Sequence, residues 1–160
     1  MRLLRRFLLL CALGWWLGGL TLYATTVVRN AHRVIGSHAR VGFVTRSVTS
    51  ELNGIGVAAL ALMLWNGAVS WRSSRGWPRR GLAASWIVAA AAHAALFALH
   101  ARLDAMLDVE ARQVREGMPF HGLHETYLIA TGVEWGAGLV YLLFALMAWT
   151  REDSPDAVRP

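Results

Sequence analysis

The sequence predicts an all-α protein, a four-helix antiparallel bundle that crosses a membrane. Four apolar runs, at 7–28, 50–71, 81–102 and 122–149, are each long enough as helices to cross a hydrocarbon core about 30 Å thick. The composition agrees, because 56% of the residues are hydrophobic and only 16% are charged, against about 25% in soluble domains. These observations exclude a soluble enzyme, a nucleic-acid-binding module and a disulfide-stapled secreted domain. They make the lipid bilayer the main partner of the chain.

The connections between the apolar runs predict how the helices begin and end. The first run continues too far for the core of a signal peptide, so we expect an uncleaved first helix. The segment 29–50 shows no clean period and is interpreted as a long loop lying partly on the membrane surface. The segment 72–80 is short and basic, and Pro78 with Gly81 punctuates it before the third helix.

The third helix is predicted to extend beyond the membrane. Asp108, Arg112 and Glu116 recur at intervals of four, which predicts ion pairs along a helix that continues to about Glu116. Gly117 and Pro119 should end that helix and start the fourth. We therefore expect a single membrane domain over 1–150 and a flexible cytoplasmic tail over 151–160.

The distribution of arginine predicts the orientation. Four spans place both termini on one side of the membrane, and the segments 1–6, 72–80 and 151–160 on that side hold nine arginines in 25 residues. The opposite segments, 29–51 and 102–125, hold seven in 47 residues. The positive-inside rule then predicts a multi-pass protein of the cytoplasmic (inner) membrane with both termini in the cytoplasm.

Two ionisable residues fall near the middle of the bilayer on different helices, His93 on the third and Glu134 on the fourth. In antiparallel helices, residues at equal depth share a constant sum of their numbers. His93 with Glu134 gives the same sum as His100 with Tyr127 and as Trp86 with Tyr141, so two polar stripes are predicted to face each other in register.

The polar stripe on the fourth helix also carries Tyr127 and Thr131, and with His93 and Glu134 these form the candidate polar core. Two interpretations of the His93–Glu134 pair stay open. It is either a hydrogen-bonded pair that fixes helix register, or a buried pair that handles a proton or anchors a ligand.

A second cluster of imidazoles and carboxylates gathers at the outer rim, and these residue types at this spacing can hold copper, zinc or another divalent ion. The candidate metal ligands are His100, Asp104, His121, His124 and Glu125. His100 with His124 could also serve as axial ligands of a haem. Polar residues in the outer halves of the first two spans, among them Thr21, Thr25, Thr49 and Asn53, suggest a cavity that opens outward.

Glycine pairs four residues apart predict close approach of helices, at Gly14 with Gly18 and at Gly132 with Gly136. They do not identify a partner. A homo-oligomer and a membrane-protein partner both stay open, whereas nucleic acid is not expected.

Two segments of the first half carry a resemblance. WWLGGLTLYATTVV at 15–28 and GFVTRSVTSELN at 42–53, with Tyr127 and Trp135 further on, resemble a family of uncharacterised small four-span bacterial membrane proteins. That family is loosely grouped with copper-resistance-type membrane proteins. The resemblance implies a four-helix membrane fold and assigns neither an activity nor a catalytic residue.

Nothing in the sequence resembles a nucleophile–base triad, a P-loop or a dinucleotide-binding fingerprint. The leading hypothesis is therefore a non-enzymatic membrane protein, either a structural or accessory subunit or a small binding protein with a buried His–Glu pair. The alternatives are a copper-like metal-handling or proton-coupled transport protein, and a haem-binding electron carrier.

Overall fold

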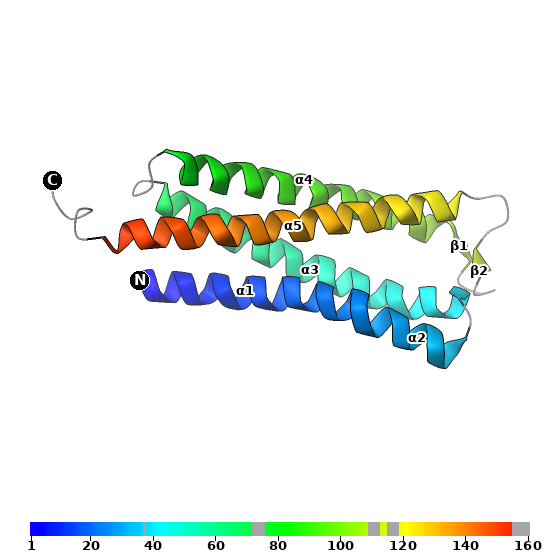
Figure 1. The fold of residues 1–160 in the computed structure, drawn as a ribbon. Coiled ribbons are helices and arrows are strands. Elements are labelled where there is room, and N and C mark those ends of the chain that lie inside the picture. The colour runs from blue at the N-terminus through cyan, green and yellow to red at the C-terminus, as the bar shows by residue number, and fades with distance from the viewer. Residues whose placement is uncertain (37, 72–75, 109–112, 115–118, 155–160) are drawn as a thin grey trace.

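The protein is an all-α bundle, seen in a computed structural model that describes residues 1–36, 38–71, 76–108, 113–114 and 119–154. The helical elements are α1 (Arg2–Leu22), η1 (Tyr23–Val27), α2 (Val28–Ile35), α3 (His38–Ser70), α4 (Trp77–Ala105) and α5 (Phe120–Glu152). The first residues of α1 and the last residues of α5 lie at one end of the bundle, which we call the terminal end (Figure 1). The opposite end, with α2 and the strands β1 (Leu107–Asp108) and β2 (Gln113–Val114), is the hairpin end.

The first membrane helix is one continuous rod built from α1, η1 and α2 (Figure 1). Its backbone stays in the right-handed helical region through the π-helical turn at Tyr23–Val27. A π turn inserts an extra residue into the helical ladder and so bends a helix. The rod ends at Gly36, whose φ of +68° is the left-handed conformation that favours glycine at a helix C-terminus.

The expectation of a long loop over 29–50 is wrong. Residues up to Ile35 belong to α2, and α3 already begins at His38. Apolar runs report only the part of a helix that lies in hydrocarbon, while the backbone ladder continues into polar residues at the helix ends. For the same reason every helix extends past its apolar run.

The extension of the third helix is also shorter than expected. Helix α4 ends at Ala105, three residues beyond its apolar run, and Leu107 then pairs antiparallel with Val114. Ion pairs four residues apart contribute only about 0.2–0.5 kcal/mol each, too little to hold a helical turn without packing. Arg112, Glu116 and Gly117 lie outside the described residues. Pro119 does precede the fourth helix, which begins at Phe120.

Helix α5 continues into the segment that we expected to be a tail. It ends at Glu152, whose side chain is buried against the first helix. Residues 155–160 lie outside the described part of the chain.

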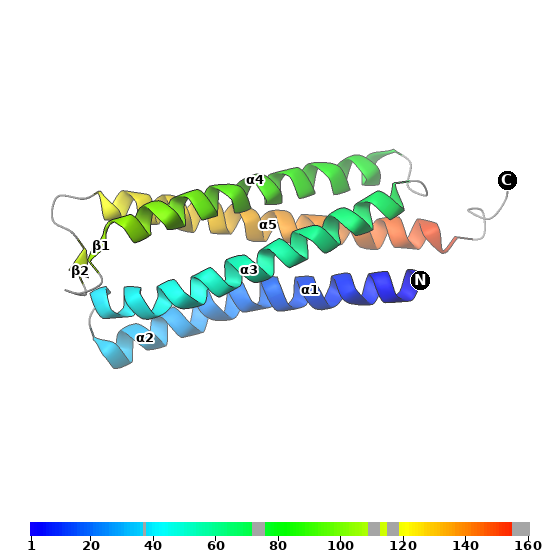
Figure 2. The ribbon, with the colours of Figure 1, turned by 180° about the vertical axis from the view of Figure 1, so that it is seen from behind.

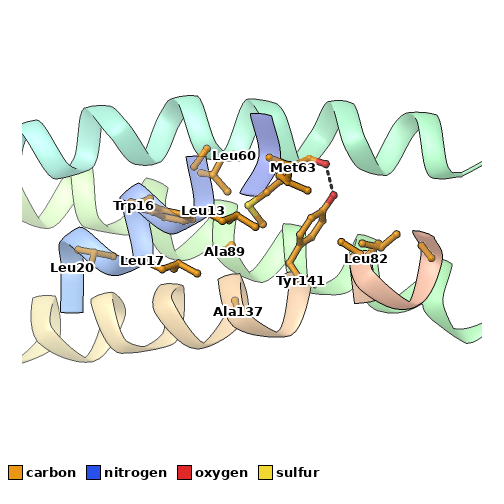
Figure 3. Close-up of a cluster of buried hydrophobic side chains, with 14 of the residues drawn as sticks. Leu13, Trp16, Leu17, Leu20, Leu60, Met63, Leu82, Ala89, Ala137 and Tyr141 are labelled. Atoms are coloured by element: carbon orange, nitrogen blue, oxygen red, sulfur yellow. Dashed lines mark hydrogen bonds between the residues drawn. The ribbon is translucent and has the colours of Figure 1, made fainter. Parts of the chain in front are cut away.

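The four rods pack as two pairs that spread apart toward the hairpin end. Helix α4 forms its most extensive contact with α5, and α1 with α3. Helix α3 runs obliquely, close to α4 at the terminal end and beside α2 at the hairpin end (Figure 2). The main core cluster draws on all four rods, and Leu13, Trp16, Met63 and Ala137 lie within it (Figure 3). A second, separate cluster around Leu96, Leu103 and Tyr127 belongs to α4 and α5 alone. The core therefore divides where the pairs separate.

The glycine pairs at Gly14 with Gly18 and at Gly132 with Gly136 do not mediate packing within the chain. A side-chain carbon added at any of the four would meet no atom within 4 Å. Close approach occurs at other glycines, among them Gly56 and Gly81, where an added carbon would lie 2.5 Å from a neighbouring side chain. The four predicted positions instead face outward from the bundle.

All four rods are long and apolar enough to cross a membrane. Large apolar side chains cover the outside of the bundle, for example Trp15, Ile87 and Ile129, which are all more than half exposed. Such a surface suits contact with lipid and not with water. The fold therefore indicates a multi-pass membrane protein.

Candidate functional site

The candidate polar core centres on the predicted pair. His93 of α4 and Glu134 of α5 are 4% and 1% exposed, and His93 Nδ1 shares a hydrogen bond with Glu134 Oε1. Each side chain therefore gives the other a polar partner. That contact reduces the cost of burying two polar groups in a low-dielectric interior.

The surroundings of His93 are apolar and tightly packed. The indole of Trp16 meets its ring edge-on with centroids 6.2 Å apart, and the Phe97 ring does so at 5.1 Å. A side-chain carbon added at Gly56 would lie 2.5 Å from His93 Cε1, so only glycine lets α3 pass this close. No described group offers a hydrogen bond to the buried His93 Nε2. The imidazole is thus held by one polar contact and by van der Waals packing.

The register predicted from the index sum is confirmed at two levels. Besides His93 with Glu134, the ring of His100 lies against Tyr127 with centroids 6.3 Å apart. At the third level, Trp86 and Tyr141 both hydrogen-bond to α3. Trp86 Nε1 donates to the Leu60 carbonyl at 3.0 Å, and the Tyr141 hydroxyl donates to the Met63 carbonyl (Figure 3).

Tyr127 and Thr131 have different roles in the polar stripe. The Tyr127 hydroxyl lies 3.4 Å from both the amide nitrogen and the amide oxygen of Asn53, so it connects α5 to α3. The Thr131 hydroxyl donates to the Tyr127 carbonyl of its own helix at 2.9 Å. The Thr131 hydroxyl is therefore satisfied within α5, whereas the Tyr127 hydroxyl connects α5 with α3.

A cavity of about 670 Å³ is lined by residues from the part of each rod nearest the hairpin end. We call the polar lining residues far along their helices from the hairpin end, Tyr23, Thr49, His100 and Tyr127, the floor, and the Tyr23 hydroxyl lies 3.1 Å from Thr49 Oγ1. The rest of the lining, which we call the walls, is mainly apolar and carries three further imidazoles. The wall residues include Val28, Val41, Phe43, Leu103, Phe120, Leu128, His32, His121 and His124.

The structure divides the predicted metal ligands into separate groups. Asp104 is bound by Arg46, whose Nε and Nη2 lie 2.6 and 3.0 Å from its two carboxylate oxygens, and His100 Nε2 is 3.6 Å from the same carboxylate. Arg46 was not among the predicted site residues, because nothing in the local pattern connects it with Asp104, 58 positions later.

The remaining predicted ligands lie apart from these. His121 pairs with Glu125 at 3.2 Å on the exposed first turn of α5, and His124 stacks on Phe120 with ring centroids 6.0 Å apart. Within the described residues, no three His, Cys, Asp or Glu side chains gather closely enough to share a metal ion.

A buried ionic network at the terminal end was missed by the sequence analysis. Arg5 of α1 is 3% exposed, and its guanidinium donates to Glu152 Oε2 at 2.7 Å, to Ser70 Oγ at 2.7 Å and to Asn66 Oδ1 at 2.9 Å. The network connects the first helix to α3 and α5. Its signal in the sequence is weak, since a basic residue near the N-terminus is expected to face headgroups.

One exposed carboxylate extends this network beyond the membrane-spanning segment. Arg6 Nη1 donates to Asp153 Oδ2 at 2.7 Å, and this hydrogen bond holds the pKa of Asp153 below its ordinary value of 3.8. The last described turn of the chain is thereby held to the first helix.

Comparisons with protein-family models, with curated proteins and with solved structures find no match. The resemblance to small four-span bacterial membrane proteins stays a prediction.

Proposed function

We propose that this chain is a small, non-enzymatic membrane protein that binds an amphiphilic small molecule in the cavity at the hairpin end. The observation that carries the proposal is the cavity itself, about 670 Å³ in volume, with apolar walls and a few convergent polar groups. Small-molecule sites are typically concave, mostly apolar and about 300–1,000 Å³ in volume.

The position of the cavity supports binding. Tyr23 and Val28, at the start of the π turn and just after it, both line it. Single π turns inside long helices are frequent at functional sites, because the inserted residue redirects side chains away from regular helical positions. The π turn is thus a second feature at the cavity that helix packing alone does not require.

The His93–Glu134 pair supports the same function by holding the helices that line the cavity. It lies two helical turns from His100 and Tyr127, about 10 Å deeper along the helices. A buried polar pair can fix the register of two helices, because a slip would leave both groups unsatisfied. We propose that it holds α4 and α5 in the alignment that places His100 beside Tyr127 on the cavity floor.

The test compares two glycine substitutions on the same helix. Gly42 borders the cavity and Gly54 does not, and a side-chain carbon at either meets nothing within 4 Å. The parent, Gly42→Leu and Gly54→Leu are each extracted from native membranes in polymer-bounded nanodiscs. Small organic molecules that co-purify are measured by mass spectrometry. We expect a molecule that accompanies the parent and Gly54→Leu and is several-fold depleted in Gly42→Leu. Equal content in both variants would contradict the proposal.

A further inference from the structure

The chemistry of the cavity selects among amphiphiles, and this inference rests on the proposed function. Its floor is made of polar side-chain tips, namely the hydroxyls of Tyr23, Thr49 and Tyr127 and the imidazole of His100. The Thr49 hydroxyl already donates to the Thr45 carbonyl of its own helix at 2.7 Å. The contacts that the Tyr23 and Tyr127 hydroxyls make across helices are 3.1–3.4 Å long, so these two phenol groups keep hydrogen-bonding capacity for a ligand.

The arginine and the carboxylate of the cavity lining pair with each other. The guanidinium of Arg46 engages both carboxylate oxygens of Asp104. An anionic headgroup would have to compete with Asp104 for Arg46, and a cationic one with Arg46 for Asp104. A neutral ligand avoids this competition, since an unpaired charge taken from water is costly.

The walls favour a flat ring. Aromatic side chains line the cavity from three of the four rods, namely Tyr23, Phe43, Phe120 and Tyr127, and imidazoles also line it. Aromatic faces and edges pack well against a planar π-system in offset or edge-to-face geometry. A planar ligand with oxygen atoms at its edge would contact these walls and reach the hydroxyls of the floor at the same time.

From these three features we infer that the cavity binds a neutral, planar ring bearing carbonyl or hydroxyl oxygens, the chemistry of a quinone or quinol headgroup. The ring oxygens meet the floor at Tyr127 and His100, and the ring itself packs between Phe43 and Phe120. An alkyl substituent of such a compound can continue along the apolar walls toward lipid. Fatty acids and haem are disfavoured, because each carries carboxylates.

The experiment measures binding of three probes that share a ten-carbon chain and differ in their polar end: a decyl-substituted benzoquinone, 1-decanol and decanoate. Purified protein in nanodiscs is titrated with each probe, and binding to empty nanodiscs is subtracted. We expect saturable binding of the quinone at one per chain, at least tenfold tighter than either of the others. Tyr127→Phe should weaken quinone binding about fivefold to tenfold, by removing one hydrogen bond.

The variants of the proposed-function test serve as controls. Gly42→Leu should abolish quinone binding, and Gly54→Leu should leave it unchanged. Thermal unfolding of each variant is followed by circular dichroism to verify folding. A loss of binding is interpreted only for variants whose melting temperature matches that of the parent.

The failures of the two proposals are distinguishable. Two results would contradict a neutral ring as the ligand and leave the proposed binding function intact. One is that decanoate binds most tightly of the three probes. The other is a Soret absorption band from the purified parent after growth with haem supply. The quinone proposal would also be wrong, and the binding function would stand, if quinone binding does not saturate while a co-purifying molecule is still depleted in Gly42→Leu. If no probe binds and the co-purifying molecules are the same in both glycine variants, both proposals are wrong.

Discussion

At the scale of single residues, burial decides what each ionisable group contributes. Glu134 and Glu152 are both buried side chains, yet their hydrogen-bond partners differ. Among the described residues Glu134 has one imidazole as its partner, whereas Glu152 accepts from Arg5, Arg6 and Ser70. The first arrangement has no redundancy, so removing one partner leaves the other without a hydrogen bond.

The His93–Glu134 pair predicts a non-additive pair of substitutions. Glu134→Leu should lower the free energy of unfolding by about 1–3 kcal/mol, because it leaves a buried imidazole unsatisfied. Adding His93→Leu should recover most of that loss, since two apolar side chains need no hydrogen bond. The free energies are measured by titration with sodium dodecyl sulfate in mixed micelles. Additive losses in the double variant would show that the pair is not a coupled unit.

The Arg6–Asp153 contact predicts a dependence on pH at the terminal end. The pKa of Asp153 is lowered in the folded protein, so the contact stabilises the fold above pH 3.8 and is lost as the pH falls through the lowered value. Asp153→Asn should therefore be less stable than the parent near pH 6, and the difference should vanish in strong acid. Melting temperatures across this range check the expectation. A difference that grows on acidification would contradict it.

At the scale of elements, the sequence predicted the helices better than their ends. The apolar runs located all four rods, and the index sum located two contacts between α4 and α5. Both succeed because they depend on helical geometry, which is local and regular. The extension of the first rod as far as Gly36 was missed, because it depends on local backbone conformation. The strand pair at Leu107 was missed because strand pairing this short leaves little signal in the sequence.

The candidate site was predictable to the extent that it follows helical periodicity. His93, Glu134 and Tyr127 share faces that a helical wheel reveals. The partners Arg5 and Arg46 were not predictable, because they lie on rods whose rotation relative to α5 and α4 no single sequence specifies. One close contact that depends on this rotation is at Gly56, where α3 lies against His93 of α4 and Trp16 of α1.

Gly56 and Gly54 therefore make a matched pair for testing element packing. An added carbon at Gly56 would lie 2.5 Å from His93 Cε1 and 2.8 Å from Trp16 Nε1, whereas at Gly54 it meets open space. Gly56→Ala should lower the free energy of unfolding by about 1–3 kcal/mol through overpacking. Gly54→Ala should be neutral or slightly stabilising, because alanine favours helix. Equal stability of the two variants would show that α3 can shift away from His93 at little cost.

At the scale of the whole molecule, the fold makes its two ends chemically different. The terminal end is fastened by the Arg5–Glu152 network, which connects the first helix with the last. At the hairpin end the rods separate into two pairs (Figure 2), and residues of both pairs line the cavity. This asymmetry fits a bundle that is closed on one side of the membrane and accessible on the other. The orientation of the bundle in the membrane then determines from which side the proposed ligand enters.

The arginine distribution predicts that the terminal end faces the cytoplasm, and single cysteines can test this. In a Cys11→Ala background, His121→Cys lies at the hairpin end and Ser154→Cys at the terminal end, and both native side chains are exposed. A membrane-impermeant maleimide applied to intact spheroplasts should label His121→Cys at once and Ser154→Cys only after lysis. The reverse pattern would invert the orientation and leave the fold intact. Labelling of both positions from the same side would contradict a four-span bundle, because α5 separates these two residues by its full length.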